Sequence, residues 1–228
     1  MEIQTTVYSI IIVTIFILLL MVFVNYKLRK YDPLTKPKGI VLLVMMGIQA
    51  IENMTKDATN EKVAKQISPY IFTVIIYIFL ANISGLFSIE SPTSNFSVTL
   101  VLAAITCILI EIFAIKENGV KKYLLGYFEP FAPMIVINLI SKVSTLMSLS
   151  LRLFGNVIAG SVLMSVIYQL LASISSAIPL VGNINIIAIV VAPALHFYFD
   201  LFSGAIQAYV FTMLTISFIG KELPSQEN

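Results

Sequence analysis

Arg152 is the residue of this chain whose presence is hardest to explain by packing alone. It lies near the middle of a long apolar run over 134–171, in which Lys142 is the only other charged residue. A fixed charge at the centre of a membrane-spanning helix costs roughly 2.5–3.5 kcal/mol on insertion scales, and a guanidinium cannot lose its proton to avoid that cost. We therefore interpret Arg152 as part of a functional site, with a polar partner or water close by.

Small and polar side chains share the helix face on which this arginine lies. At 100° per residue, the face also carries Thr145, Ser148, Gly155, Asn156 and Ala159. Small residues in membrane helices often serve only to let another helix approach closely. Packing explains these small residues about as well as a functional role does, but it does not explain the arginine.

A second group of polar residues lies in the last apolar run, over 184–219. His196, Asp200 and Gln207 share one helical face there, together with Ser203, Gly204 and Phe211. A carboxylate within a membrane span, next to the only histidine of the chain, indicates a proton relay. The alternative is a structural ion pair of Asp200 with either Arg152 or His196.

The composition defines the class of protein that has to hold these residues. Of 228 residues, 58% are hydrophobic and 11% are charged, and the mean hydropathy is +0.96. These values are typical of a polytopic helical membrane protein and exclude an ordinary soluble domain. A single cysteine and a single histidine exclude a disulfide framework and the usual multi-residue metal sites. The sequence also lacks a nucleotide-binding loop, so we expect no cofactor, no metal, no nucleic-acid partner and no active site of the chain's own.

The apolar runs predict a single all-α membrane domain over 1–228 with five crossings. The crossings are predicted at 7–26, 68–87, 96–115, 134–171 and 184–219. We expect the first to be a retained span, because the residues before it carry no basic charge. The segment 39–65 is predicted to be a helix on the membrane surface, since its apolar part is too short to cross a hydrocarbon core of about 30 Å.

The basic residues predict the orientation of the chain. They gather in 27–65 and 116–122, whereas 1–6, 88–95 and 172–183 contain none. Under the positive-inside rule, this pattern places the N-terminus outside and the C-terminus in the cytoplasm. We therefore expect a multi-pass protein of a cell membrane, with the bacterial plasma membrane favoured.

The last two apolar runs are too long for ordinary spans. As single helices at 1.5 Å per residue they would measure about 57 and 54 Å, nearly twice the hydrocarbon thickness. They must tilt strongly or break, and Pro193 is a position at which the second run could bend. We predict a strongly tilted antiparallel hairpin, an arrangement that is unusual unless it wraps around another body.

The segment around Arg152 resembles a known family. Residues 149–160 read Leu-Ser-Leu-Arg-Leu-Phe-Gly-Asn-Val-Ile-Ala-Gly, which closely resembles the signature of subunit a of the rotary F-type ATP synthases. The segments 207–215 and 67–83 resemble the last helix and the second span of the same family. Length and predicted topology match the family over nearly the whole chain.

The resemblance implies a stator subunit beside a rotating ring of c subunits, each of which has a membrane-buried carboxylate. Two offset half-channels in subunit a would lead protons to and from that carboxylate, and the tilted hairpin would be the surface against the ring. Arg152 matches the essential arginine between the half-channels. Asn156 and Gln207 match its polar neighbours, and Asn82 matches a residue credited with a place in the outer channel.

The resemblance also implies the partners of the chain. They are the c-ring, subunit b of the peripheral stalk, the remaining ATP synthase subunits and the lipid bilayer. The predicted surface helix over 39–65 is a candidate contact for the peripheral stalk, although a position on the lipid surface explains it about as well.

The chain departs from the family pattern at three positions. Ser161 stands where many members have a glutamate, and Asp200 where the same members have a histidine, so the acidic group has moved to the neighbouring helix. Both residues lie in the outer halves of their helices, where either could serve the entry channel, with His196 beside the acid. Lys142 stands where some relatives have an acid, and we interpret it as a residue that snorkels to the cytoplasmic interface.

Two other classes of protein are alternatives. A secondary transporter would also bury charges, but it should contain two halves with paired broken helices, which the sequence does not show. An intramembrane hydrolase would need a nucleophile or metal motif or a carboxylate pair, and none is present. The sequence leaves open whether the coupling ion is a proton or sodium, because ion choice depends largely on the surroundings of the ring carboxylate. The direction of operation is also open.

Overall fold

The computed structural model describes residues 2–32, 36–87, 89–128, 133–176 and 186–223. Its helices are α1 (Glu2–Arg29), α2 (Ile40–Lys56), α3 (Glu61–Ile83), α4 (Phe96–Asn118), α5 (Val120–Gly126), α6 (Met134–Ser176), α7 (Ile186–His196) and α8 (Ser203–Glu222). Short 3-10 turns, η1 (Ser84–Phe87) and η2 (Pro92–Ser94), follow α3, and a π-helical segment, η3 (Phe197–Phe202), joins α7 to α8. No strand occurs in these described residues, and the predicted all-α class is confirmed.

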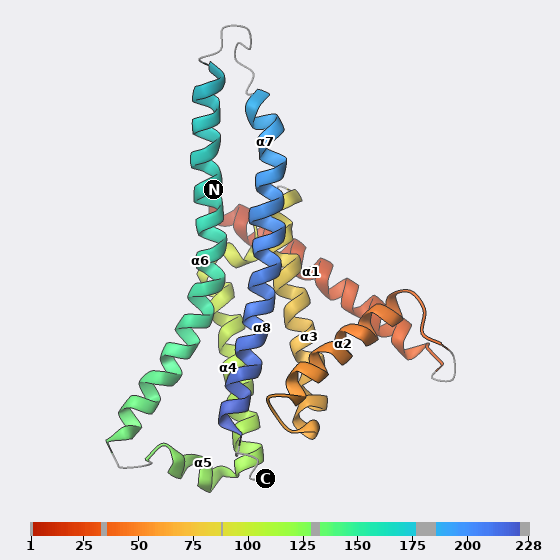
Figure 1. Ribbon diagram of the computed structural model, residues 1–228, viewed down its shortest axis with the longest axis vertical. Helices are drawn as coiled ribbons and strands as arrows, with labels where there is room; N and C mark the ends of the chain where they lie inside the picture. The colour runs from red at the N-terminus through yellow and green to blue at the C-terminus, as the bar shows by residue number, and fades with distance from the viewer. Residues whose placement is uncertain (1, 33–35, 88, 129–132, 177–185, 224–228) are drawn as a thin grey trace.

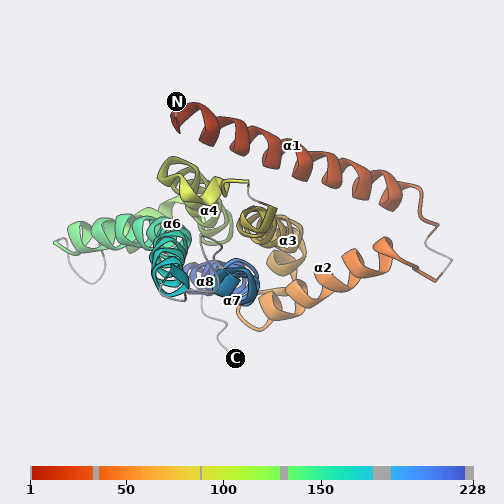
Figure 2. The same cartoon turned by 90° about the horizontal axis from the view of Figure 1, so that it is seen from above.

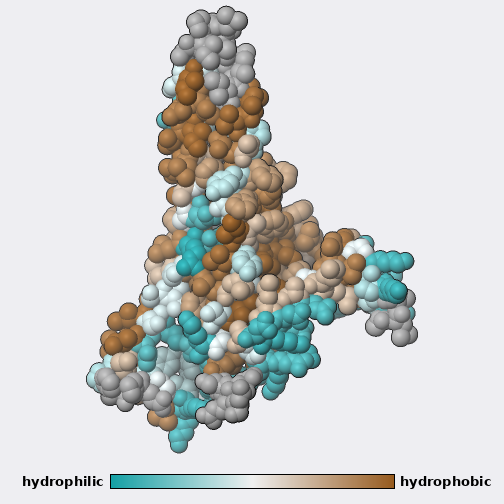
Figure 3. All heavy atoms as spheres, in the orientation of Figure 1, coloured by the Kyte–Doolittle hydropathy of each residue, from teal (hydrophilic) through white to brown (hydrophobic). Residues whose placement is uncertain are grey.

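Five helical stretches in the described part of the chain are long and apolar enough to cross a membrane. They are Val7–Arg29, Glu61–Phe87, Phe96–Asn118, Met134–Ser176 and Ile189–Glu222. Figure 3 shows hydrophobic residues over most of the upper and middle parts of one face, a hydrophilic patch at mid-height on the hairpin, and hydrophilic residues gathered at the lower end around α2. The chain is thus a multi-pass membrane protein, as predicted.

The centre of the molecule is a bundle of α3, α4, α6 and α8 (Figures 1 and 2). Helix α3 packs against α2 and α8, and α4 packs against α6 and α8. Because lipid tails are as apolar as these side chains, close van der Waals packing holds the helices together. The buried side chains form two clusters, one with Ile51, Ile67, Ile71 and Ile219, and the other with Ile78, Leu153 and Phe211.

Helix α1 lies apart from this bundle, and Figure 2 shows it running along one edge. In the chain alone, Ile12, Phe16 and Leu19 are each more than half exposed, with values of 55%, 57% and 61%. Val13 and Ile17, in contrast, are buried. A helix that is apolar all round and covered on only one narrow side is one that faces lipid over most of its surface.

The segment 39–65, which was predicted to be one surface helix, is divided between two helices in the structure. Helix α2 ends at Lys56, and α3 begins at Glu61 after a break. The break has a local cause, because Asn60 adopts an extended conformation (φ −80°, ψ 150°) at the N-cap of α3. The carboxylate that follows it suits the positive end of the helix dipole. Residues 61–65 therefore begin the second membrane-spanning helix.

The helix α6 and the returning helix α7–η3–α8 form the predicted antiparallel hairpin, whose far end rises above the rest of the molecule (Figure 1). Helix α6 has 43 residues, and the returning helix is continuous over Ile189–Glu222. Pro193 removes one hydrogen bond within the returning helix, and one turn later the helix widens into η3. A π-helical turn inside an α-helix frequently marks a functional site, and η3 contains Asp200.

Candidate functional site

A cavity of about 620 Å³ lies between α6, η3 and the segment that links α3 to α4. We call it the Asp200 cavity. Five of the seven residues predicted to form the site surround it, whereas Arg152 and Gln207 do not line it. Its polar lining among the described residues consists of Asn82, Glu90, Ser91, Ser94, Asn156, Ser161, Ser165, Tyr168, His196 and Asp200.

Asp200 and His196 are in direct contact inside this cavity. His196 Nδ1 lies 2.6 Å from Asp200 Oδ2, and Tyr168 Oη lies 2.9 Å from His196 Nε2. When Nδ1 carries the ring proton, it donates to the carboxylate and leaves Nε2 to accept from the tyrosine hydroxyl. The three side chains thus form a hydrogen-bonded row from α6 to η3, along which a proton can be held or passed. Tyr168 was not predicted from the sequence, because its place opposite His196 depends on how α6 and α7 pack.

The Asp200 carboxylate is partly shielded by the end of α3. A Cβ atom added at Gly85 in η1 would lie 3.6 Å from Asp200 Cγ, so the backbone there approaches the carboxylate closely. The side chains of Asp200 and His196 are 23% and 34% exposed. Among the described residues, no ion pair joins Asp200 to Arg152. Of the two structural pairs considered from the sequence, only the one with His196 is therefore present.

Asn82 is fixed in the wall between α3 and α8. Its Oδ1 accepts a hydrogen bond from Thr93 Oγ1 at 2.8 Å, and its Nδ2 lies 3.5 Å from Gly204 O. Ser91 Oγ donates to Ala81 O at 2.6 Å, which folds the loop after η1 back over the end of α3. Ser91 and Thr93 were missed from the sequence, because no local pattern places this loop on α3.

A hydrogen bond joins the two arms of the hairpin near the lower part of the cavity. Ser203 Oγ donates to Asn156 Oδ1 at 2.9 Å. Since α6 and α8 run antiparallel, one helical turn beyond this bond brings Arg152 on α6 and Gln207 on α8 to about the same level. Arg152 and Gln207, which were predicted on two separate helices, therefore lie at about the same level of the hairpin.

Within the described part of the chain, Gln207 has a buried nitrogen without a hydrogen-bond partner, and Arg152 has no carboxylate partner. Gln207 is 7% exposed, and its Nε2 has no hydrogen-bond partner. Arg152 is half-buried, and no described carboxylate lies within 4.0 Å of its guanidinium. A buried amide nitrogen without a partner costs roughly 1–3 kcal/mol, so the Gln207 side chain is an exception to the usual pairing of buried polar groups.

The small residues beside the arginine leave an open face on α6. Ser148, Gly155 and Ala159 are exposed, and a Cβ atom added at Gly155 would meet nothing within 4 Å. Ser161 lies further along the helix, where its hydroxyl donates to a backbone carbonyl of the same helix at 2.9 Å. Ser161 therefore contributes a polar surface to the Asp200 cavity but no titratable group.

Lys142, at the other end of the hairpin, is more than the snorkelling residue predicted from the sequence. Its Nζ lies 2.8 Å from Glu111 Oε1 on α4 and 2.5 Å from Glu222 Oε1 on α8, and its side chain is 28% exposed. The partners were missed because they lie on other helices. An acidic residue inside the apolar run 96–115 was nevertheless a signal that could have pointed to Glu111.

The fold and these sites together define an all-α, multi-pass membrane protein with a polar cavity, a carboxylate–histidine pair and a half-buried arginine in its bundle. The sequence profile of the ATP synthase A chain family matches residues 6–220. The chain belongs to this family, which confirms the resemblance found in residues 149–160.

Individual relatives agree with this assignment. ATP synthase subunit a of Desulforamulus reducens is 36% identical over 186 residues, which cover 79% of this chain and 64% of that protein. ATP synthase subunit a of Mycoplasmoides gallisepticum is 33% identical over 239 residues, which cover 96% of this chain and 78% of that protein. ATP synthase subunit a of Staphylococcus aureus (strain Newman) is 37% identical over 165 residues, which cover 68% of this chain and 65% of that protein. The chain thus spans somewhat less than two thirds of the first and third of these relatives.

Proposed function

We propose that the chain is the stator subunit a of an F-type ATP synthase, which leads protons to and from a carboxylate on a ring of c subunits. The observation that carries this proposal is the Asp200 cavity, which gathers a titratable pair on one side of the level of Arg152. Lys142 and its two carboxylate partners lie on the other side. Two polar regions, separated by a permanent charge, are what two offset half-channels require.

The Asp200 cavity is the entry half-channel in this proposal. A proton that reaches the cavity binds the Asp200 carboxylate or the His196 ring, and their 2.6 Å contact lets it pass between them. Asn82 and Asn156 line the same cavity and continue the polar surface towards the level of Arg152. Ser161 adds a hydroxyl to this surface, so the titratable role rests on Asp200.

Arg152 separates the two half-channels. Its charge is permanent, and it favours the ionised form of a ring carboxylate that passes beside it. The same charge repels a proton that would move directly from one half-channel to the other. Gln207, at about the same level on α8, is the polar neighbour of the arginine in this proposal. Each proton then delivers about 2.3 kcal/mol per 100 mV of membrane potential, which appears as rotation of the ring.

The partners occupy different faces of the chain. The open face of α6, with Ser148, Gly155 and Ala159, lies against the c-ring. Helix α2 lies on the cytoplasmic membrane surface, where it contacts subunit b of the peripheral stalk or rests on lipid. The distribution of basic residues supports an orientation with this end in the cytoplasm and the N-terminus outside, in a bacterial plasma membrane. The remaining ATP synthase subunits complete the assembly.

The variant Arg152→Ala tests this function. We expect the complex to assemble, and ATP-driven acidification of inverted membrane vesicles to be abolished, because no other permanent charge separates the half-channels. Pumping near the wild-type rate would contradict the mechanism. Stable copurification of the chain with a c-ring separates the stator subunit from a secondary transporter, which would not need a rotor.

A further inference from the structure

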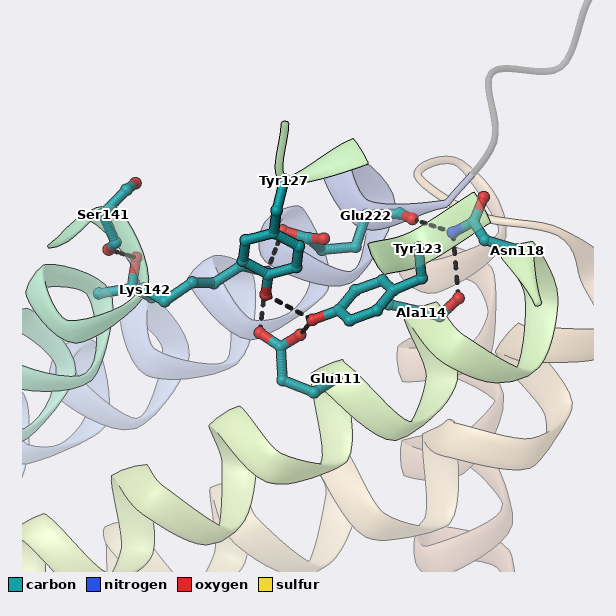
Figure 4. Close-up of polar contacts among 9 residues, drawn as sticks. Glu111, Ala114, Asn118, Tyr123, Tyr127, Ser141, Lys142 and Glu222 are labelled. Atoms are coloured by element: carbon teal, nitrogen blue, oxygen red, sulfur yellow. Dashed lines mark hydrogen bonds and ion pairs between the residues drawn. The ribbon is translucent and has the colours of Figure 1, made fainter. Parts of the chain in front are cut away.

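Five side chains, from four helices and from the residue that follows α5, meet at the lower end of the hairpin, and we call them the Lys142 cluster (Figure 4). Lys142 Nζ lies 2.8 Å from Glu111 Oε1 and 2.5 Å from Glu222 Oε1. Tyr123 Oη donates to Glu111 Oε2 and lies 2.6 Å from Tyr127 Oη. The cluster thus connects α4, α5, α6 and α8 through charged and hydroxyl groups.

The end of α8 is held in place at this cluster. Asn118 Nδ2, at the end of α4, donates to Glu222 O at 2.7 Å and to Ala114 O at 3.0 Å. These bonds fix the last turn of α8 against α4. The Glu222 side chain is therefore positioned by the fold, although it belongs to the last residue of its helix.

Two cavities meet at the cluster. One, of about 340 Å³, is lined by Tyr127 and its neighbours, and the other, of about 240 Å³, is lined by Cys107 and Thr145 among others. Lys142 and Glu222 line both cavities. Their ion pair therefore forms the partition between them.

The smaller cavity lies on the Arg152 side of the Lys142 cluster along α6. Thr145 lines this cavity and lies two helical turns from Arg152 on the same face of α6. The larger cavity is bordered by Lys122 and Lys221, two of the basic residues that indicate the cytoplasmic side. The partition of Lys142 and Glu222 accordingly stands between the arginine face and the cytoplasm.

The net charge of the Lys142 cluster allows it to bind one proton. Two carboxylates face one ammonium group, so the cluster carries one excess negative charge. Burial raises the pKa of Tyr123, and its hydrogen bond to Glu111 acts in the same direction, so this hydroxyl stays protonated and remains a donor. Glu111 uses both oxygens, one for Lys142 and one for Tyr123. Within the described residues, the Glu222 carboxylate contacts other side chains through Oε1 alone, which leaves Oε2 available to a proton.

We propose that Glu222 is the proton acceptor of the exit route, and that Lys142 and Glu111 are positioning residues that hold it between the two cavities. This inference rests on the proposed function. A proton leaves the carboxyl group of the rotor as its O–H bond breaks, crosses the smaller cavity through water, and forms an O–H bond at Glu222 Oε2. It then passes to water on the cytoplasmic side and restores the carboxylate, with no electron transferred.

The spacing of the two titratable sites agrees with this assignment. Along the returning helix, Asp200 and Glu222 lie about 33 Å apart at 1.5 Å per residue. This length is close to the hydrocarbon thickness of about 30 Å. One helix would therefore carry the proton-exchanging group of each route, with Gln207 between them at the level of Arg152.

The other charged or titratable groups near Glu222 are either not carboxylates or already hold a donor on each oxygen. Glu111 is the other carboxylate of the cluster, and two donors already hold it. The remaining neighbours in the cluster and the two cavities are cations, hydroxyls and a thiol: Lys122, Lys142, Lys221, Tyr123, Tyr127 and Cys107. Glu222 is therefore the carboxylate of the cluster that can still accept a proton from water in the cavities.

Passive proton flux through the stripped membrane sector, with the pH set independently on the two sides, tests the assignment. We expect Glu222→Gln to lower the flux by about 100-fold, and the remaining flux to lose its dependence on cytoplasmic pH. Glu222→Asp keeps a carboxyl group and should restore part of the flux together with that dependence. The control Glu117→Gln removes a carboxylate from the same end of α4 outside the cluster, and it should behave as wild type.

The outcomes separate this inference from the proposed function. Wild-type flux with wild-type dependence on cytoplasmic pH in Glu222→Gln, at a normal amount of subunit, overturns the inference. If Glu222→Gln does not assemble, Glu222→Asp decides, because a flux that no longer depends on cytoplasmic pH, although a carboxyl group is kept, would equally overturn it. If Arg152→Ala is inactive while Glu222→Gln conducts normally, only the exit assignment fails. If Arg152→Ala pumps normally, the proposed function fails whatever Glu222 does.

Discussion

Ser203 Oγ lies 2.9 Å from Asn156 Oδ1, and this contact marks the register between the two arms of the hairpin. Above it, a Cβ atom added at Gly160 would lie 4.0 Å from Phe199 Cβ, which is the pairing that the same antiparallel register requires. Below it, the register brings Arg152 level with Gln207. This one hydrogen bond between α6 and α8 therefore gives the position of the Asp200 cavity relative to Arg152 along the hairpin.

Arg152→Lys is expected to leave the complex assembled and to abolish ATP-driven pumping almost completely. A desolvated ammonium can lose its proton, whereas a guanidinium cannot, so the lysine does not keep a permanent charge between the half-channels. Acidification of inverted vesicles measures the effect, with the amount of subunit in the membrane as the control. Pumping at the wild-type rate would show that any cation at this position is sufficient.

Asp200→Asn is expected to slow passive proton flux through the stripped membrane sector by about 100-fold, the usual size of a lost acid–base group. The amide keeps the size of the side chain but loses the titratable group. His196→Ala should have a smaller effect, because water can replace an imidazole in a hydrated cavity. The measurement is the flux at a normal amount of subunit.

A double variant serves as the control for Asp200. Ser161→Glu combined with Asp200→His restores the arrangement that the family resemblance implies, and it should recover part of the flux lost in Asp200→Asn. If Asp200→Asn conducts like wild type, the acid is structural. Glu90, which lines the same cavity, then becomes the next candidate for the entry relay.

Cysteines placed singly at Ser148 or Ala159, in a Cys107→Ser background, are expected to crosslink to cysteines on the outer helix of the c-ring. Both positions are exposed on the open face of α6. A cysteine at Val157 should not crosslink, because Val157 lines the Asp200 cavity. Gel analysis of the crosslinked products measures the contact. Equal crosslinking from all three positions would mean that the open face packs on something other than the rotor.

Gly204→Ala is expected to destabilise the packing of α3 on α8. The added Cβ atom would lie 2.8 Å from Asn82 Cβ, and overpacking of this kind typically costs roughly 1–3 kcal/mol. The midpoint of thermal unfolding of the detergent-solubilised complex should fall. Gly126→Ala is the matched control, because its added Cβ atom would meet nothing within 4 Å. An unchanged midpoint in Gly204→Ala would show that α3 can move away without cost.

The sequence predicted the spans well because the length and apolarity of a crossing are local properties. The five predicted runs correspond to the five long apolar helices of the described chain. Helical periodicity also brought Asn156 and Arg152 to one region of α6, and His196 next to Asp200. The bond between His196 and Asp200 joins residues one turn apart on the same helix, which is the kind of contact that spacing alone can reveal.

Contacts between helices could not be predicted in this way. Lys142 was interpreted alone, because its partners Glu111 and Glu222 lie far from it in the chain. Tyr168 reaches His196 only through the packing of α6 on α7. The end of the surface helix was also wrong, since the extended conformation of Asn60 starts α3 within a stretch whose composition reads as continuous helix.

The π-helical segment η3 makes the last helix sensitive to insertion and deletion. It accommodates a wider turn over Phe197–Phe202, between the part that carries His196 and the part that carries Gln207. Each residue of an α-helix turns the chain by about 100°, so the loss of one residue here would shorten the helix slightly but rotate its two parts strongly against each other. A relative with one residue fewer in this segment would aim a different side chain into the cavity. In this helix, the loss or gain of one residue therefore also changes the direction in which the side chains beyond it point.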